Sequence, residues 1–152
     1  MNKHTPKQHL ATYDSDFYLW SSGQAALIRA GKFDQLDIEN VAEEIESLGR
    51  SDKRALGSQL RRLLMHLLKW QHQASRRSQS WRNSINSARD ELRVIVQDSP
   101  SLKPVLEASL ADEYRIARKR AVEETKLSGK SFPADCPYSF DQILNEDFWP
   151  EL

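Results

Sequence analysis

Residues 36–81 read LDIENVAEEIESLGRSDKRALGSQLRRLLMHLLKWQHQASRRSQSW and decide the fold class of this chain of 152 residues. Asp37 is a good helix N-cap, and apolar residues recur every three or four positions after it. They are Ile38, Val41, Ala42, Ile45, Leu48, Leu56, Leu60, Leu63, Leu67 and Trp70. The stripe keeps its phase across Gly49, and a lone glycine costs only about 1 kcal/mol in a helix. We therefore expect one long central helix over about residues 38–73.

The charge changes sign along this helix. Residues 39–48 hold four glutamates and no basic residue, and these are Glu39, Glu43, Glu44 and Glu46. Residues 49–93 hold eleven basic and three acidic residues, a net charge of +8, whereas residues 131–152 hold five acidic residues and no basic one. The acidic C-terminal stretch therefore suits a position over the basic middle. The whole chain has 22 residues of each sign, so net charge alone favours neither nucleic acid nor an anionic membrane as partner.

Capping residues and glycines mark three further helices. Their predicted limits are Asp14, Ser15 or Asp16 to Gly31, Ser78 or Ser80 to Asp98, and Ser99-Pro100 to Gly129. The stretch FPADCPYSFDQILNEDFWPEL that follows has three prolines, so we expect an aromatic-rich arm with one short helix capped by Ser139. No run with a period of two is present, so the sequence predicts an all-α bundle of about four main helices.

The length predicts one domain. We expect residues 1–12 to be a flexible N-terminus and residues 13–152 to form a single helical domain. Cys136 is the only cysteine, so folding needs no oxidising compartment. The N-terminus lacks the apolar core of a signal peptide, and no apolar run approaches the ~18 residues of a membrane span. We expect a soluble cytoplasmic protein that does not bind membranes.

Several motifs, in one order along the chain, resemble a known family. They are a first helix containing Trp20, LDIENVAEEIESLGRSDKRAL (36–56), HLLKWQ (66–71), RSQSW (77–81), SPSL (99–102) and FPADCPYSFDQILNEDFWP (132–150). From about Tyr13 to Pro150, the chain resembles the bacterial domain-of-unknown-function family 29. The resemblance implies a helical fold and supplies no catalytic residues.

A metal site is one candidate for chemistry. Glu39, Glu43 and Glu46 share a helix face at spacings of four and three, which can present carboxylates to a metal ion. Such a site needs ligands from a second helix, and the chain has no Glu-x-x-His or Glu-x-x-Asp pair to supply them. The alternative is a solvated face on which Glu46 pairs with Arg50. We expect no metal and no cofactor.

Arg61 and His66 are the candidate catalytic residues if the chain is an enzyme. Their Arg-x4-His spacing is similar to that of the helical ribonucleases of the HEPN type, and this likeness implies action on a scissile phosphate across a dimer interface. Arg can hold a phosphate while His transfers a proton near neutral pH. The alternative is that His66 packs beside Trp70 and hydrogen-bonds a neighbour.

Nucleic-acid binding without catalysis is a further alternative. It rests on basic residues of the 50–93 region interleaved with Trp70 and Trp81. These are Arg61, Arg62, Lys69, Arg76, Arg77, Arg82, Arg89 and Arg93. Both tryptophans lie in or beside apolar stripes, however, where they are more often part of a core.

Asp52 occupies a position of the apolar stripe between Leu48 and Leu56. A buried carboxylate needs a partner, so we predict an internal contact between Asp52 and an arginine that ties two helices together. The candidate donors are Arg50, Arg54, Arg77 and Arg82. The alternative is that Asp52 lies in water.

The sequence favours a non-enzymatic helical interaction module that binds another protein or itself. The predicted binding residues are Glu43, Asp52, Arg62, His66, Arg77 and Arg82. The nucleic-acid binder on residues 50–93, and the ribonuclease or metal-dependent enzyme centred on Arg61 and His66 or on Glu43 and Glu46, remain as alternatives.

Overall fold

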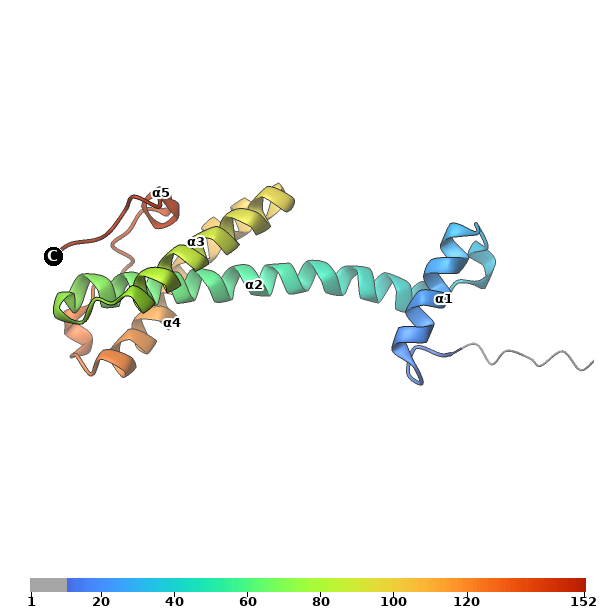
Figure 1. Cartoon of the computed structure of the whole chain (residues 1–152), viewed down its shortest axis with the longest axis horizontal. Helices are drawn as coiled ribbons and strands as arrows, with labels where there is room; N and C mark the ends of the chain where they lie inside the picture. The colour runs from blue at the N-terminus through green and yellow to red at the C-terminus, as the bar shows by residue number, and fades with distance from the viewer. Residues whose placement is uncertain (1–10) are drawn as a thin grey trace, which may run out of the picture. The chain divides into compact units, whose positions relative to one another are not determined.

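A computed structural model describes residues 11–152 (Figure 1). The flexible terminus predicted for residues 1–12 therefore lies almost wholly outside the described residues. The α-helices are α1 (Phe17–Arg29), α2 (Ile38–His72), α3 (Gln79–Asp98), α4 (Lys103–Thr125) and α5 (Phe140–Leu144). Short 3-10 helices lie between them: η1 (Phe33–Gln35), η2 (Ala74–Arg76), η3 (Pro100–Leu102) and η4 (Gly129–Ser131). The described part of the chain contains no strand, so the all-α prediction is confirmed.

Contacts divide the chain into two compact units. The first unit runs from Met1 to Gly49 and the second from Arg50 to Leu152, and α2 contributes residues to both. The single domain expected over residues 13–152 remains a prediction. No helix within residues 11–152 is long and apolar enough to cross a membrane.

The long central helix is confirmed, because α2 runs without interruption through Gly49. Asp37 begins it: its carbonyl accepts from the Val41 N–H at 2.9 Å, and its carboxylate accepts from the Asn40 side-chain amide at 2.8 Å. The hydrogen bond from Asn40 is the main cause of a pKa for Asp37 below its usual value. Desolvation opposes this shift, and the hydrogen bond from Trp20 adds to it. The capping residue expected from the sequence is thus the one in place.

In the first unit, Trp20 of α1 packs against the start of α2. Its indole N–H donates to the Asp37 carboxylate at 3.1 Å, and the Gln24 side chain accepts from the Asp37 N–H at 2.8 Å. Tyr13 adds an edge-on contact to Trp20, with the ring centroids 4.9 Å apart. Trp20 is the only buried side chain among residues 11–49.

The second unit contains the main core. The remainder of α2 supplies six buried leucines, and α3, α4 and the C-terminal arm cover them. The leucines are Leu56, Leu60, Leu63, Leu64, Leu67 and Leu68, at the spacing that places one face of a helix in a core. Ile85 of α3 and Tyr114 of α4 complete the packing.

The C-terminal arm is part of this core, as expected from its aromatic content. Phe132, Tyr138 and Ile143 are buried. Ser139 caps α5, and a reciprocal pair of hydrogen bonds with Gln142 forms a capping box. The predicted short helix and its cap are confirmed.

Two predicted limits of the fourth helix are wrong. The Ser99-Pro100 start forms the 3-10 turn η3, so α4 begins only at Lys103. At the other end Lys126 takes a left-handed conformation, φ 61°, and its N–H bonds to the Val122 carbonyl. The Thr125 hydroxyl also accepts from the Leu127 N–H at 3.2 Å. These local bonds turn the chain before Gly129.

Arg89 of α3 anchors the arm. It is 1% exposed and donates to the carbonyls of Ile143 at 2.9 Å, Phe148 at 2.7 Å and Glu146 at 3.4 Å. Burial, with the nearby Arg93, lowers the pKa of this guanidinium below its usual value. The buried guanidinium of Arg89 therefore satisfies three backbone carbonyls of the C-terminal arm, which has little regular structure.

Candidate functional site

The first unit exposes most of its large apolar side chains. Residues 11–49 hold eight of the ten exposed large apolar residues in the described chain. These are Phe17, Tyr18, Leu19, Ile28, Phe33, Ile38, Ile45 and Leu48. A cluster of this kind is typical of a surface that binds a partner. The sequence contains a signal of this exposure that sequence reasoning missed. Phe17, Tyr18 and Leu19 are consecutive, so they cannot all face the buried side of one helix.

Four residues at the start of α2 form a continuous apolar stripe. Ile38, Val41, Ile45 and Leu48 follow one another at spacings of three, four and three, the heptad spacing of a helix that pairs with another helix. Ile38, Ile45 and Leu48 are 63%, 64% and 70% exposed, and Val41 is half-buried. We call these four residues the α2 stripe.

The α2 stripe lies in an acidic setting. Residues 11–49 hold eight acidic and two basic residues, a net charge of −6. Four of the acidic residues, Glu39, Glu43, Glu44 and Glu46, lie on α2 itself. Such a surface is complementary to one that presents apolar side chains flanked by basic ones.

Tyr13 fixes one of these carboxylates. Its phenol donates to the Glu44 carboxylate at 2.5 Å, and this hydrogen bond is the first cause of a raised pKa for Tyr13. The bond ties the segment before α1 to the acidic part of α2. It also orients Glu44 beside the stripe.

One turn beyond the stripe, α2 becomes basic. Arg50, Lys53 and Arg54 line a hollow of about 530 Å³, whose other lining residues are Gly57, Ser58, Arg61 and Glu113. The Arg61 Nε donates to the Glu113 carboxylate of α4 at 2.7 Å. Gly57 permits this approach, because a Cβ at that position would lie 2.9 Å from a Glu113 oxygen.

Several of the remaining basic residues are engaged inside the second unit. Lys69 donates to Glu124 at 2.7 Å and lies over the Trp81 ring. Arg77 donates to the Trp70 carbonyl at 2.8 Å and pairs with the Glu151 carboxylate at 2.9 Å. This last contact places part of the acidic C-terminal stretch over the basic middle, as expected.

Two predicted binding residues, Arg77 and Arg82, meet at a tryptophan pair. Both guanidinium groups lie over the Trp70 ring, 4.8 and 5.1 Å from its centroid, and Arg82 also lies over Trp149 at 4.7 Å. Trp70 is only 6% exposed. These cation–π contacts hold the end of the arm against α2 and leave Trp70 unavailable for stacking on a base.

The two candidate catalytic residues face different surroundings. On an α-helix, side chains five positions apart point about 140° apart around the axis. Arg61 engages Glu113, whereas the charged groups that affect His66 are Lys69, Arg62 and Glu124. The structure therefore brings the predicted binding residues Arg62 and His66 together and directs Arg61 elsewhere.

His66 is neutral at pH 7. Burial, with a smaller contribution from nearby Lys69 and Arg62, lowers its pKa to about 4. Its Nδ1 is buried and makes no hydrogen bond to any described residue. The predicted hydrogen bond from this histidine to a neighbour is thus not made through Nδ1.

The carboxylates that the sequence singled out on α2 are exposed. Glu43, Glu46 and Asp52 all lie at the surface. No group of three or more His, Cys, Asp or Glu residues within residues 11–152 is placed to hold a metal ion. The predicted internal contact between Asp52 and an arginine is wrong, because the second unit buries the face that begins at Leu56 and leaves Asp52 in water.

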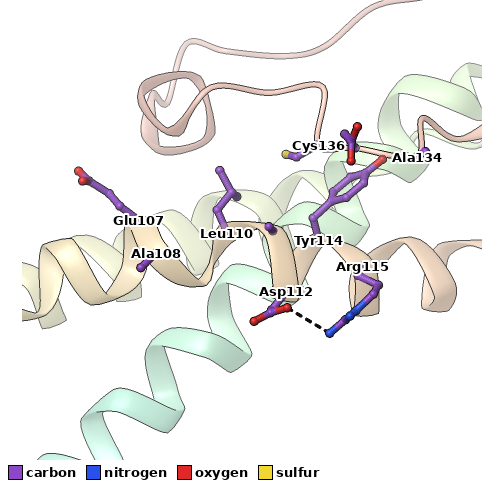
Figure 2. Close-up of a pocket in the computed structure, with 10 residues that line it drawn as sticks. Glu107, Ala108, Leu110, Asp112, Tyr114, Arg115, Ala134 and Cys136 are labelled. Carbon is purple, nitrogen blue, oxygen red and sulfur yellow. Dashed lines mark hydrogen bonds and ion pairs between the residues drawn. The ribbon is translucent and has the colours of Figure 1, made fainter.

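Sequence reasoning also missed a groove between α4 and the C-terminal arm (Figure 2). Its volume is about 510 Å³, and Leu110, Tyr114 and Cys136 are among its lining residues. The Tyr114 phenol donates to the Pro133 carbonyl at 2.7 Å, which fixes the arm at this edge. Burial raises the pKa of the Cys136 thiol, so it is not an activated nucleophile.

The comparison with protein families covers nearly the whole chain. Residues 12–149 match the family described as "Domain of unknown function DUF29". No curated protein and no solved structure matches the chain. The matched range includes all five α-helices and most of the C-terminal arm, which agrees with the order of motifs in the sequence. The chain therefore belongs to the DUF29 family.

Proposed function

We propose that this chain is a non-enzymatic helical module that binds another protein through the α2 stripe. The observation that supports the proposal is the exposure of Ile38, Ile45 and Leu48 at heptad spacing. Apolar side chains at this spacing gain stability when a second helix covers them, since each buried one contributes about 1.5–3 kcal/mol relative to exposure.

The amount of exposed apolar surface is suited to an interface. At the observed exposed fractions, each of the eight large apolar residues of the first unit presents on the order of 100 Å². Their sum is comparable with the ~800 Å² that each partner contributes to an interface of standard size, but Phe17, Tyr18 and Leu19 face different directions, so one partner covers only part of it. A partner that covered only the α2 stripe would use part of this area.

The charge of the first unit defines the class of partner. Its net charge of −6 repels acidic surfaces and attracts basic ones over about 8–10 Å at physiological ionic strength. The proposed partner is thus a helix that presents apolar residues between basic residues.

Site-specific photo-crosslinking in cells tests this proposal. A photoreactive amino acid replaces Ala42, an exposed residue on α2 next to the stripe, in the full chain. We expect a covalent protein adduct whose yield falls at least about tenfold when Ile45→Ser and Leu48→Ser are added.

The matched control places the same photoreactive residue at Val94. This residue is 52% exposed but lies on α3 in the second unit. Equal adducts from positions 42 and 94, or an adduct at position 42 that survives the two serine substitutions, would contradict the proposal. Far-UV circular dichroism confirms that each variant stays helical.

A further inference from the structure

We infer that the basic hollow beside α2 binds a ligand that carries several linked phosphates. This hollow, of about 530 Å³, is lined by Arg50, Lys53, Arg54 and Arg61 among others. Its volume lies within the ~300–1,000 Å³ of small-molecule sites. All of its lining residues belong to the second unit, so the site is independent of the α2 stripe and of the proposed function.

The lining residues from α2 form one continuous face of the helix. They include Arg50, Arg54, Gly57 and Arg61, at spacings of four, three and four along an uninterrupted helix. These spacings keep side chains on one side of a helix. At a rise of 1.5 Å per residue, the distance along the axis from Arg50 to Arg61 is about 16.5 Å. The cations thus form a row, and a chain of phosphates can contact more of them than a single phosphate can.

The lining of the hollow is strongly positive. It holds four basic residues and one acidic residue, Glu113, a net charge of +3. The Glu113 carboxylate already pairs with Arg61 at 2.7 Å. Lys53 and Arg54 are exposed, and neither forms an ion pair with a carboxylate of residues 11–152. A concave surface lined by charges of one sign concentrates ions of the opposite sign, so the hollow attracts anions.

The side chains in the hollow suit phosphate oxygens. A guanidinium donates two parallel hydrogen bonds to a phosphate, and a lysine ammonium adds a point charge. Between Arg54 and Arg61 the lining is Gly57 and Ser58, whose small side chains leave room for a ligand. The exposed Ser58 hydroxyl can donate a further hydrogen bond. No aromatic side chain is among the described lining residues, so the hollow recognises phosphates and offers no surface for stacking a base.

Isothermal titration calorimetry of the full chain with tripolyphosphate tests the inference. We expect binding whose affinity falls as the salt concentration rises. Arg54→Gln should weaken binding about tenfold, because a charged fork is lost, and Arg54→Lys should weaken it less, because the charge remains. The matched control is Arg120→Gln, which removes an exposed arginine of α4 outside the hollow. The control should change the affinity by less than about twofold.

Glu113→Gln is a second test, and misfolding cannot produce its expected result. The substitution removes the only carboxylate among the described lining residues and releases Arg61 from its ion pair. Tripolyphosphate should bind about three- to tenfold more tightly, because the lining gains one unit of positive charge and one free guanidinium. A misfolded variant would bind more weakly instead.

Three results would overturn the inference. They are no binding of tripolyphosphate, equal losses from Arg54→Gln and Arg120→Gln, and weaker binding by Glu113→Gln. Equal losses would mean that the anion responds only to the overall charge of the chain. Ile45→Ser with Leu48→Ser lies in the first unit and should leave phosphate binding unchanged. Failure of the phosphate site therefore leaves the proposed protein interaction standing, and the reverse also holds.

A competition experiment distinguishes two sources of linked phosphates. A single-stranded oligonucleotide of roughly eight thymidines is added to the complex with tripolyphosphate. Displacement shows that the hollow also accepts the backbone of a nucleic-acid strand, whereas persistence of the complex limits the ligand to a free oligophosphate. Either result supports the site, because both require tripolyphosphate to be bound there.

Discussion

At the scale of single residues, Arg89 carries much of the stability of the C-terminal arm. Arg89→Met removes donors from three carbonyls, two of which the charged fork reaches within 2.9 Å. We expect a loss of about 3 kcal/mol in the free energy of unfolding, because backbone acceptors lose charged partners. Urea unfolding followed by circular dichroism measures the change.

Arg93→Ala is the matched control for this prediction. Arg93 lies one turn further along α3, and its ion pairs with Asp90 and, at 3.7 Å, with Glu146 of the arm are exposed at both ends. Exposed pairs contribute about 0–1 kcal/mol, so the control should change the unfolding free energy by less than 1 kcal/mol. A similar loss in both variants would mean that Arg89 does not anchor the arm.

His66 should make folding sensitive to acid. Its pKa is about 4 in the folded chain and ~6.5 when unfolded, so the unfolded chain binds a proton at a higher pH. The contribution of neutral His66 to the free energy of unfolding is complete above pH ~6.5 and is lost as the pH falls towards 4. The full pKa shift of His66 would correspond to roughly 3 kcal/mol of unfolding free energy. The ring is only part-buried, so solvent reduces the expected change to about 1–2 kcal/mol.

His66→Gln should remove that part of the pH dependence. The measurement is the unfolding free energy of both chains at pH 7 and at pH 5, with the difference between the two pH values compared. A nuclear magnetic resonance titration of the ring gives the pKa directly. A midpoint near 6.5 for His66 in the folded chain would show that the ring is open to water.

At the scale of elements, two glycines of α2 should respond to alanine in opposite ways. Nothing lies within 4 Å of a Cβ built on Gly49, so Gly49→Ala should stabilise the helix by about 0.5–1 kcal/mol. A Cβ at Gly57 meets Glu113 at 2.9 Å and displaces the carboxylate that pairs with Arg61. Gly57→Ala should therefore bring no gain. The measurement is the thermal unfolding midpoint of each variant. Equal stabilisation by Gly49→Ala and Gly57→Ala would show that the Glu113 side chain can move away at no cost.

The helices themselves were predictable because their signals are local. The apolar spacing and Asp37 place α2, and Ser139 with Gln142 places α5. The fourth helix was misjudged at its end because a left-handed lysine is rare, and the sequence offered a glycine three residues later as the better candidate. Hydrogen bonds through Thr125 decide this end, and the pattern of apolar residues does not report them.

The site was less predictable because long-range contacts decide which charges remain at the surface. The basic run of residues 50–93 looks uniform in sequence. In the fold, Arg89 donates to three backbone carbonyls and Arg77 pairs with Glu151, whereas Arg54 remains exposed. Likewise Asp52 lies in phase with buried leucines, yet the core begins only at the next turn with Leu56.

At the scale of the whole molecule, the buried core and most of the exposed large apolar side chains lie in different units. The second unit contains seventeen of the eighteen buried apolar residues of the described chain, and Trp20 is the remaining one. The first unit contains the α2 stripe. A chain built in this way can keep an apolar surface exposed, because the core of the second unit does not include that surface.

The fragment Arg50–Leu152 should consequently fold without the first unit. Its length lies within the range in which single domains form their own core, and it retains the leucine face of α2 with α3, α4 and the arm. We expect a cooperative urea transition with a midpoint within about 0.5 M of the transition reported by the second unit in the full chain. The fluorescence of Trp70, Trp81 and Trp149 follows it. An unfolded fragment would instead show that residues 13–152 form the single domain expected from the sequence.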